Sequence, residues 1–204
     1  MRALLRTFGE LSITGGLVML LFCAYLLWGT SAYTQRQQAL LQSQLHEEQD
    51  ARKIDKIRLG RAVALLRIPR LGRDYHYAVV EGVDEEHLKQ GPGHYPGTAL
   101  PGQVGNFVVS GHRTTYGAPF NRIDELERDD EIVVEAREAR YTYRVTSQQV
   151  VEPTDVDVVA PVPGKPDISA IRPMITLSTC HPEYSAAQRL IVYGVLKETE
   201  LRKV

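Results

Sequence analysis

The sequence predicts an all-β domain, a barrel or a sandwich, preceded by an N-terminal transmembrane helix and a helical stalk. Three observations support this prediction. From residue 62 onward, short runs rich in β-branched and aromatic residues alternate with turns containing Gly, Pro and Asp. Residues 36–60 have a helix-forming composition without proline and with only a thin apolar stripe. Near the start of the chain, a long segment carries no charge.

The uncharged segment runs from Leu11 to Gln35, 25 residues in all. As a helix, residues 11–29 span roughly 28 Å, close to the thickness of a bilayer's hydrocarbon core. Arg2 and Arg6 precede the segment, so the positive-inside rule places the N-terminus in the cytoplasm and the rest of the chain outside. A signal peptide cleaved near 30–32 is the alternative, but the uncharged run is long for a signal core. We therefore expect a single-pass cell-membrane protein with a cytoplasmic N-terminus at 1–10, a transmembrane anchor at 11–33, a stalk or linker at 34–60 and a folded domain at 61–204.

The folded domain is predicted from its β-rich runs. The expected strands are 62–68, 76–83, 106–112, 131–136, 141–146, 148–151, 174–180 and 189–196. Two short helices are expected at 84–90 and 119–126. The segment 152–173, which has four prolines before Pro173, is expected to be a long loop with room for one helical turn.

Composition and residue spacing exclude two classes of protein. The 24 Lys and Arg residues are balanced by 25 Asp and Glu residues, whereas a nucleic-acid-binding protein usually has a marked basic excess. The six histidines show no H-x-x-x-H spacing, and there is no C-x-x-C motif. Cys180 and His181 are adjacent, and neighbouring side chains of an extended segment point to opposite sides. We therefore expect no nucleic-acid partner, no metal site and no cofactor.

Cys180 is the strongest candidate for a reactive group. The chain has two cysteines, and the other, Cys23, lies inside the apolar segment. Cys180 is then unpaired outside the cell, where a free thiol is a liability unless it is needed. It ends an apolar run, and Pro182 prevents that strand from continuing. These features favour a nucleophile, which requires a base or a positive charge nearby.

His112 and Arg189 are the expected partners of Cys180. His181 is next to the cysteine, but the alternation of a strand directs it to the other side. His112 ends the apolar run NFVVSGH, so it can meet Cys180 where two strands end. If the strands around Cys180 and Arg189 form a hairpin connected by 181–188, Arg189 lies opposite the cysteine. Its guanidinium stays charged and can stabilise an oxyanion. A loop histidine and an exposed edge arginine are the alternatives.

These motifs together resemble the sortase family, the cysteine transpeptidases of Gram-positive surfaces. The resemblance rests on TLSTC (176–180), on the arginine of QRLIVYGVL nine residues later, and on GHRTTYG about 70 residues upstream. The stretches GHYPGTALPGQVGNFVVSGHRTTYGAPFNRIDEL and TCHPEYSAAQRLIV are similar to class E sortases of actinobacteria. The resemblance covers about residues 60–197, and it implies that 61–204 is a sortase catalytic domain.

The resemblance implies an eight-stranded β-barrel and a two-step reaction. Cys180 would cleave a C-terminal sorting signal of the Leu-Ala-X-Thr-Gly or Leu-Pro-X-Thr-Gly type between Thr and Gly, forming a thioacyl-enzyme. An amine of a peptidoglycan precursor, lipid II, would resolve the thioester and leave a surface protein attached to the wall. His112 would act as general acid and base, and Arg189 would stabilise the oxyanion or position the substrate.

Three alternatives remain at this point. Thr179 could contact the acyl group of the substrate, although an ordinary strand threonine is the simpler interpretation. A thiol hydrolase would use the same catalytic residues, with water resolving the thioester. A membrane-tethered binding module would have lost activity, although the intact cysteine, histidine and arginine set argues against it.

Overall fold

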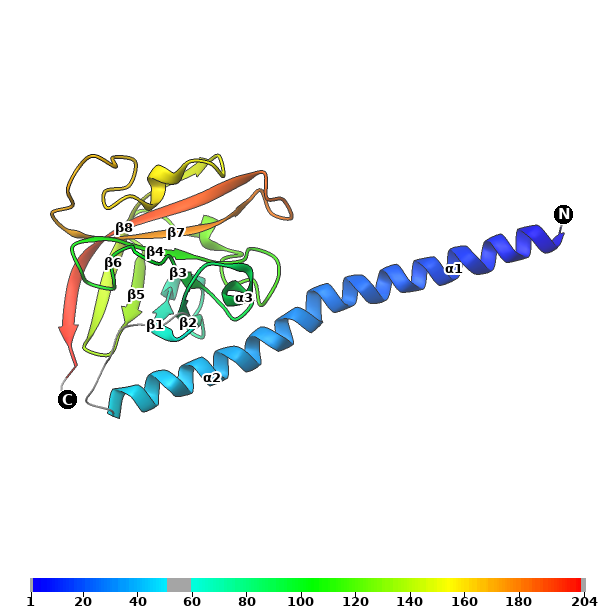
Figure 1. The fold of residues 1–204 in the computed structure, drawn as a ribbon, viewed down its shortest axis with the longest axis horizontal. Helices are drawn as coiled ribbons and strands as arrows, with labels where there is room; N and C mark the ends of the chain where they lie inside the picture. The colour runs from blue at the N-terminus through cyan, green and yellow to red at the C-terminus, as the bar shows by residue number, and fades with distance from the viewer. Residues whose placement is uncertain (1, 51–59, 203–204) are drawn as a thin grey trace.

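In the computed structural model, which describes residues 2–50 and 60–202, eight strands close into a barrel that follows a long N-terminal helix (Figure 1). The helical segments are α1 (Arg2–Ala24), a π-helical turn (Tyr25–Gly29), α2 (Thr30–Asp50), α3 (Glu85–Leu88) and 3₁₀ turns at Pro69–Leu71, Ile123–Glu125 and Val156–Val159. The strands are β1 (Ala62–Arg67), β2 (His76–Glu81), β3 (Gly93–His94), β4 (Gly105–Ser110), β5 (Glu131–Glu135), β6 (Ala139–Val151), β7 (Pro173–His181) and β8 (Gln188–Leu201). Around the barrel their order is β1-β2-β3-β4-β7-β8-β6-β5.

The barrel confirms the predicted fold class, but it divides the strands differently from the sequence-based prediction. The expected strands 141–146 and 148–151 are one strand, β6, because a register shift between Val145 and Ser147 absorbs the break in the apolar pattern. The eighth strand is β3, which was missed because its two residues lie among turn-forming glycines and prolines. The helix expected at 119–126 is only the 3₁₀ turn Ile123–Glu125.

The wall formed by β4, β7 and β8 separates the barrel interior from a covered outer face. Alternate residues of these strands belong to the buried core: Phe107, Val109, Ile175, Leu177, Leu190 and Val192. Residues in between face outward, and the long loop 152–172 covers part of that face. There the Asn106 side chain donates to the carbonyls of Val158 and Ala160, both at 3.1 Å, and the Thr176 hydroxyl donates to Asn106 Oδ1 at 2.7 Å. The inner face of the wall therefore belongs to the hydrophobic core, whereas the outer face is partly covered by the loop 152–172.

The α2 helix lies against the barrel through a single face. Thr30, Thr34, Gln38 and Leu41 recur every three or four residues, and all four are buried. The Gln38 amide pairs with the β2 backbone, accepting from the Ala78 N–H at 2.7 Å and donating to the Ala78 carbonyl at 3.0 Å. The expected stalk, 34–60, is thus helical as far as Asp50, and its first part is docked; residues 51–59 lie outside the described residues.

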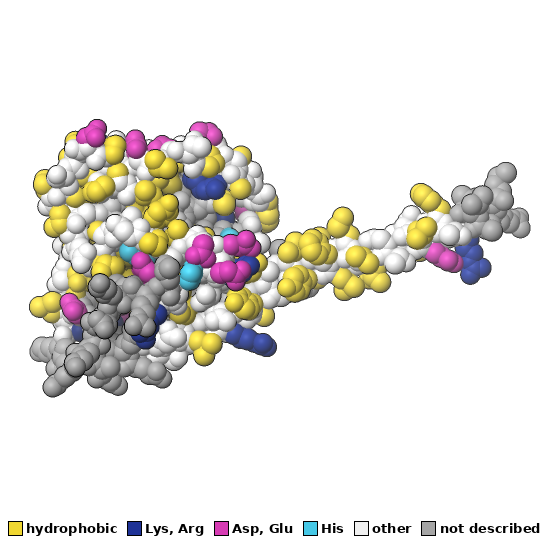
Figure 2. Space-filling view, in the orientation of Figure 1, with side chains coloured by type: hydrophobic (Ala, Val, Ile, Leu, Met, Phe, Trp, Pro, Cys, Tyr) yellow, Lys and Arg dark blue, Asp and Glu magenta, His cyan; other side chains and the backbone are white. Residues whose placement is uncertain are grey.

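The α1 helix extends away from the barrel and carries exposed apolar side chains along its length (Figure 2). The 19 residues Arg6–Ala24 have a mean hydropathy of 1.6, and none of the apolar window is buried. Because a run of this length and composition can cross a bilayer, α1 fits a single-pass anchor. A signal sequence has the same properties, so the topology stays a prediction.

Candidate active site

Strands β4 and β7 run parallel, and their register brings the segment that follows β4 to the end of β7. The ladder pairs Gly105 with Pro173 and continues to Ser110 and Ser178. Beyond the last pair, the Gly111 N–H still donates to the Ser178 carbonyl at 3.1 Å. The same offset of residues, extended beyond this bond, predicts that His112 lies near Cys180.

Strands β7 and β8 form the expected antiparallel hairpin. Cys180 pairs directly with Arg189, which confirms the predicted register. Residues that pair on neighbouring strands share one face of a sheet. Cys180 and Arg189 therefore share the face opposite to the barrel core, and the extended register of β4 predicts His112 beside them.

The residues that flank Cys180 point to the other side of β7 and join it to the segment that follows β4. Thr179 is 2% exposed, and its hydroxyl donates to the Gly111 carbonyl at 2.8 Å. One step further, the Arg113 guanidinium donates to His181 Nδ1 at 3.0 Å. His181 thus lies on the face opposite to Cys180, as the alternation of the strand predicts.

A close packing contact supports the turn that carries His112. A Cβ atom on Gly111 would lie 2.8 Å from the ring of Phe120, a side chain that is fully buried in the core. The Phe120 N–H donates to the His112 carbonyl at 3.0 Å. Only glycine at position 111 lets the backbone pass this close to the Phe120 ring.

The His112 imidazole lies in a partly desolvated setting. Its ring centroid is 5.0 Å from that of Tyr116, and its Nε2 is buried without a hydrogen-bond partner among the described residues. Burial lowers the pKa of His112 below its ordinary value; Glu85 opposes this shift and Lys89 adds to it, both less strongly. Burial therefore favours the neutral imidazole, which is the form that can accept a proton.

Cys180 and Arg189 are both half-buried, so a substrate can reach them. Arg189 Nη1 donates to the carbonyls of Ala186 and Gln188, at 3.0 and 2.9 Å, and within the described residues no carboxylate pairs with this guanidinium. A thiol, a neutral imidazole and an unneutralised guanidinium are the groups required for nucleophilic attack, proton transfer and oxyanion stabilisation.

Metal ligands and cavities do not mark another reaction centre here. Among residues 2–50 and 60–202, no three His, Cys, Asp or Glu side chains are grouped so that they could hold a metal ion. A cavity of about 680 Å³ lies between α2 and residues 71–77, and neither Cys180 nor His112 lines it.

Sequence reasoning missed Arg113. It lies in GHRTTYG directly after His112, and a charged side chain in a turn is usually exposed. In the structure it is 5% exposed, and it contacts the end of β7. The only sequence feature that could have identified Arg113 was its position, one residue beyond His112 at the end of an apolar run. A surface arginine can occupy the same position.

Comparisons with known proteins identify the family of this chain. The family model for the sortase domain matches residues 66–197. Sortase SrtE1 of Streptomyces coelicolor is 38% identical over 97% of this chain, which spans 58% of that protein's length. Sortase SrtE2 of the same organism is 30% identical over 94% of this chain and 81% of its own.

Solved structures point in the same direction. The SrtF sortase from Corynebacterium diphtheriae has a TM-score of 0.71 at 34% identity, covering 74% of this chain and 92% of that one. Sortase E from Streptomyces avermitilis has a TM-score of 0.64 at 41% identity, covering 71% and 93%. These comparisons confirm the expected resemblance. This chain belongs to the sortase family, and its relatives include sortases SrtE1 and SrtE2.

Proposed function

We propose that this protein is a class E-type sortase, a cysteine transpeptidase anchored in the cell membrane by its N-terminal apolar helix α1 and acting outside the cell through the domain 61–204. The observation that carries the proposal is the pairing of Cys180 with Arg189, together with the parallel register of β4 and β7, which supports a position of His112 near the thiol. One relative, sortase E1 from Streptomyces coelicolor, has a TM-score of 0.63 at 38% identity and was solved with a tripeptide in its active site. A peptide substrate at the corresponding face of this chain follows from that likeness.

In the first step, the sulfur of Cys180 attacks the carbonyl of the threonine in the sorting signal, while the thiol proton passes to His112. The guanidinium of Arg189 donates hydrogen bonds to the oxyanion that forms or to the adjoining signal. The protonated His112 then gives its proton to the leaving glycine amine, and the carbon–nitrogen bond breaks. The product is a thioester between Cys180 and the substrate protein.

In the second step, an amine of the peptidoglycan precursor lipid II attacks the thioester. His112 takes a proton from this amine, and the sulfur of Cys180 leaves and regains a proton from His112. The neutral form of His112, which burial favours, suits both steps, since each begins with proton transfer to the imidazole.

Thr179 is assigned a supporting role in this proposal. Its hydroxyl is already donated to the Gly111 carbonyl, on the side of the strand away from Cys180. We therefore infer that Thr179 holds the ends of β4 and β7 together, and that its side chain is not used to bind substrate.

The proposed partners are surface proteins with a C-terminal sorting signal, lipid II and the membrane. A signal of the Leu-Ala-X-Thr-Gly type is favoured over the Leu-Pro-X-Thr-Gly type by the likeness to class E relatives. A competition assay between two peptides that differ only in Ala or Pro at the second position tests this preference. Preferential cleavage of the Pro peptide would overturn it.

The proposed reaction is tested with the full chain in detergent micelles, a sorting peptide and a saturating amine. The expected result is that the transpeptidation product exceeds the hydrolysis product, and that mass spectrometry detects an acyl adduct on Cys180. The variants Cys180→Ala, His112→Ala and Arg189→Ala should lose turnover. If hydrolysis dominates at saturating amine, the protein is instead a thiol endopeptidase that uses the same residues. If no adduct forms, it is a binding module.

A further inference from the structure

Arg113 connects the strand that carries the base to the strand that carries the nucleophile. Its guanidinium is buried, with its side chain 5% exposed. Nη1 donates to the carbonyl of Cys180 itself at 3.3 Å and to His181 Nδ1 at 3.0 Å. Since Arg113 directly follows His112 in the chain, one side chain spans the junction between the two reacting residues.

The contact with His181 defines the state of that histidine. A guanidinium has only N–H donors, so Nδ1 of His181 must accept and its ring proton must be on Nε2. An imidazole bound in this way is a neutral acceptor that faces away from Cys180. His181 therefore contributes a fixed point for Arg113 rather than a proton for the reaction.

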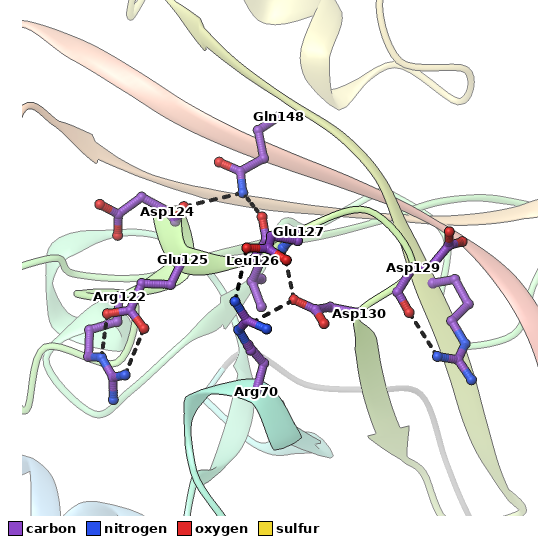
Figure 3. A network of polar contacts seen from close by, with 10 residues as sticks. Arg70, Arg122, Asp124, Glu125, Leu126, Glu127, Asp129, Asp130 and Gln148 are labelled. Carbon is purple, nitrogen blue, oxygen red and sulfur yellow. Dashed lines mark hydrogen bonds and ion pairs between the residues drawn. The ribbon is translucent and has the colours of Figure 1, made fainter.

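The charge of Arg113 is neutralised from a third segment. Asp124, in the 3₁₀ turn Ile123–Glu125, places Oδ2 at 3.0 Å from Arg113 Nη2. Figure 3 shows the Asp124 carboxylate directed away from the polar cluster that holds its own backbone, where Gln148 Nε2 reaches the Asp124 and Leu126 carbonyls. Gln148 thus holds the backbone of Asp124, while the carboxylate of Asp124 binds Arg113.

A second link on the same loop has the same effect. Asn121 Nδ2 donates to the Arg113 carbonyl at 3.0 Å and to Glu183 Oε1 at 2.9 Å. Glu183 lies in the connection between β7 and β8, which leads to Arg189. The segment after His112 is therefore held to the segments on both sides of the nucleophile.

From this geometry we propose that Arg113 is a positioning residue, which uses His181 and Asp124 to hold His112 and Cys180 in register for proton transfer. The proposal rests on the proposed function only for its kinetic readout. The fork shape of the guanidinium is essential, because three acceptors on two segments, the end of β7 and the 3₁₀ turn of Asp124, are contacted at once. A lysine at this position keeps the charge but offers a single nitrogen, and so cannot span all three acceptors.

The kinetic test compares Arg113→Met and Arg113→Lys with the wild-type full chain. We expect each variant to lower kcat, by about 100-fold for Met and by at least about 10-fold for Lys, because misplacement of reacting groups by about 1 Å has this effect. KM should change by less than about threefold, since the peptide-binding face is intact. Recovery of wild-type kcat by lysine would show that charge alone matters and would overturn the proposal.

A matched control separates positioning from stability. Arg144 also binds one carbonyl, that of Asp129 at 2.8 Å, and one carboxylate, that of Glu131 at 2.6 Å, away from the site. Arg144→Met should keep kcat within about twofold of wild type at a temperature where circular dichroism shows both variants folded. An equal loss of kcat in Arg113→Met and Arg144→Met would contradict the positioning role.

A second readout needs no peptide and therefore survives failure of the proposed function. The rate at which iodoacetamide alkylates Cys180 is measured against pH, with Cys23→Ala as the common background. Arg113→Met and Arg113→Lys should both shift this profile relative to wild type, because the coupling between thiol and imidazole depends on their alignment. Profiles identical to wild type in both variants would refute the proposal whatever the peptide assay shows.

If Arg113→Met does not fold, His181 provides the same test. His181→Leu removes the acceptor, and His181→Asn returns an oxygen near the place of Nδ1. Leucine should lower kcat by about 10-fold, and asparagine should restore it to within about threefold of wild type. Equal activities in these two variants would contradict the proposed contact.

Discussion

Replacing Gln38 with leucine tests whether α2 is an integral part of the folded domain. Gln38 is 6% exposed and makes three hydrogen bonds: two with the Ala78 backbone, and one from Nε2 to the Gln90 carbonyl at 2.8 Å. A Cβ on Gly91 would lie 2.0 Å from Gln38 Nε2, so the barrel has room for this amide only because residue 91 is glycine. At about 0.5–1.5 kcal/mol for each bond, Gln38→Leu should lower the free energy of unfolding by about 2–4 kcal/mol. The loss of free energy in Gln38→Leu cannot exceed the free energy with which α2 docks on the barrel. If the helix detaches, water can hydrogen-bond the exposed backbone groups of β2.

The free energy is measured by urea unfolding of the full chain in micelles, followed by circular dichroism. Cleavage by trypsin at the exposed Arg36, which lies on the docked part of α2, reports local detachment of the helix. Gln44→Leu, at an exposed position of the same helix, is the control and should change neither measurement. If Gln38→Leu matches this control in both assays, α2 is not held to the barrel through this amide.

Three further predictions concern the site itself. Tyr116→Ala should raise the pKa of His112 towards its ordinary value, measured by NMR titration of the imidazole, because burial is the main cause of the shift. The lowered pKa of His112 also makes the free energy of unfolding depend on pH. His112 contributes stability above about pH 6.5, and this stability is lost as the pH falls through the lower pKa of the folded state. Tyr116→Ala should reduce this loss, which is measured by urea unfolding. Thr179→Val should lower the free energy of unfolding by about 1–3 kcal/mol by leaving the Gly111 carbonyl unpaired, whereas Thr179→Ser should lose less than Val does; equal losses would exclude the hydroxyl as the cause. Gly111→Ala should cost about 1–3 kcal/mol through contact with Phe120 and also reduce kcat, and an unchanged thermal midpoint would show that the ring moves freely.

Local patterns were sufficient for the strands that are long and buried on both faces. The runs that became β4 and β7 were predicted from their continuous apolar residues, and the pairing of Cys180 with Arg189 followed from the distance between them in the chain. The missed β3 contains only two residues, Gly93 and His94, and makes its pairs with β2 and β4. No local pattern encodes a strand of that length, because its residues are extended by their neighbours rather than by their own periodicity.

Of the candidate site, the sequence predicted the residue types and their strand ends but not their alignment. His112 and Cys180 lie far apart in the chain, and only the parallel pairing of β4 with β7 brings the segments that carry them together. The docking of α2 was also not predictable from the pattern, since Thr34 and Gln38 are polar residues of the expected stalk, which a sequence assigns to solvent.

The sequence by itself determined an apolar N-terminal helix, a β-rich domain and a cysteine, histidine and arginine at three strand ends, because these depend on periodicity, composition and short-range connection. The tertiary structure decided the register of β4 against β7 and the burial of Arg113, because both depend on contacts between segments distant in the chain. The buried guanidinium of Arg113 obtains its acceptors from two other segments, the end of β7 and the turn that holds Asp124. These segments meet only once the barrel has closed.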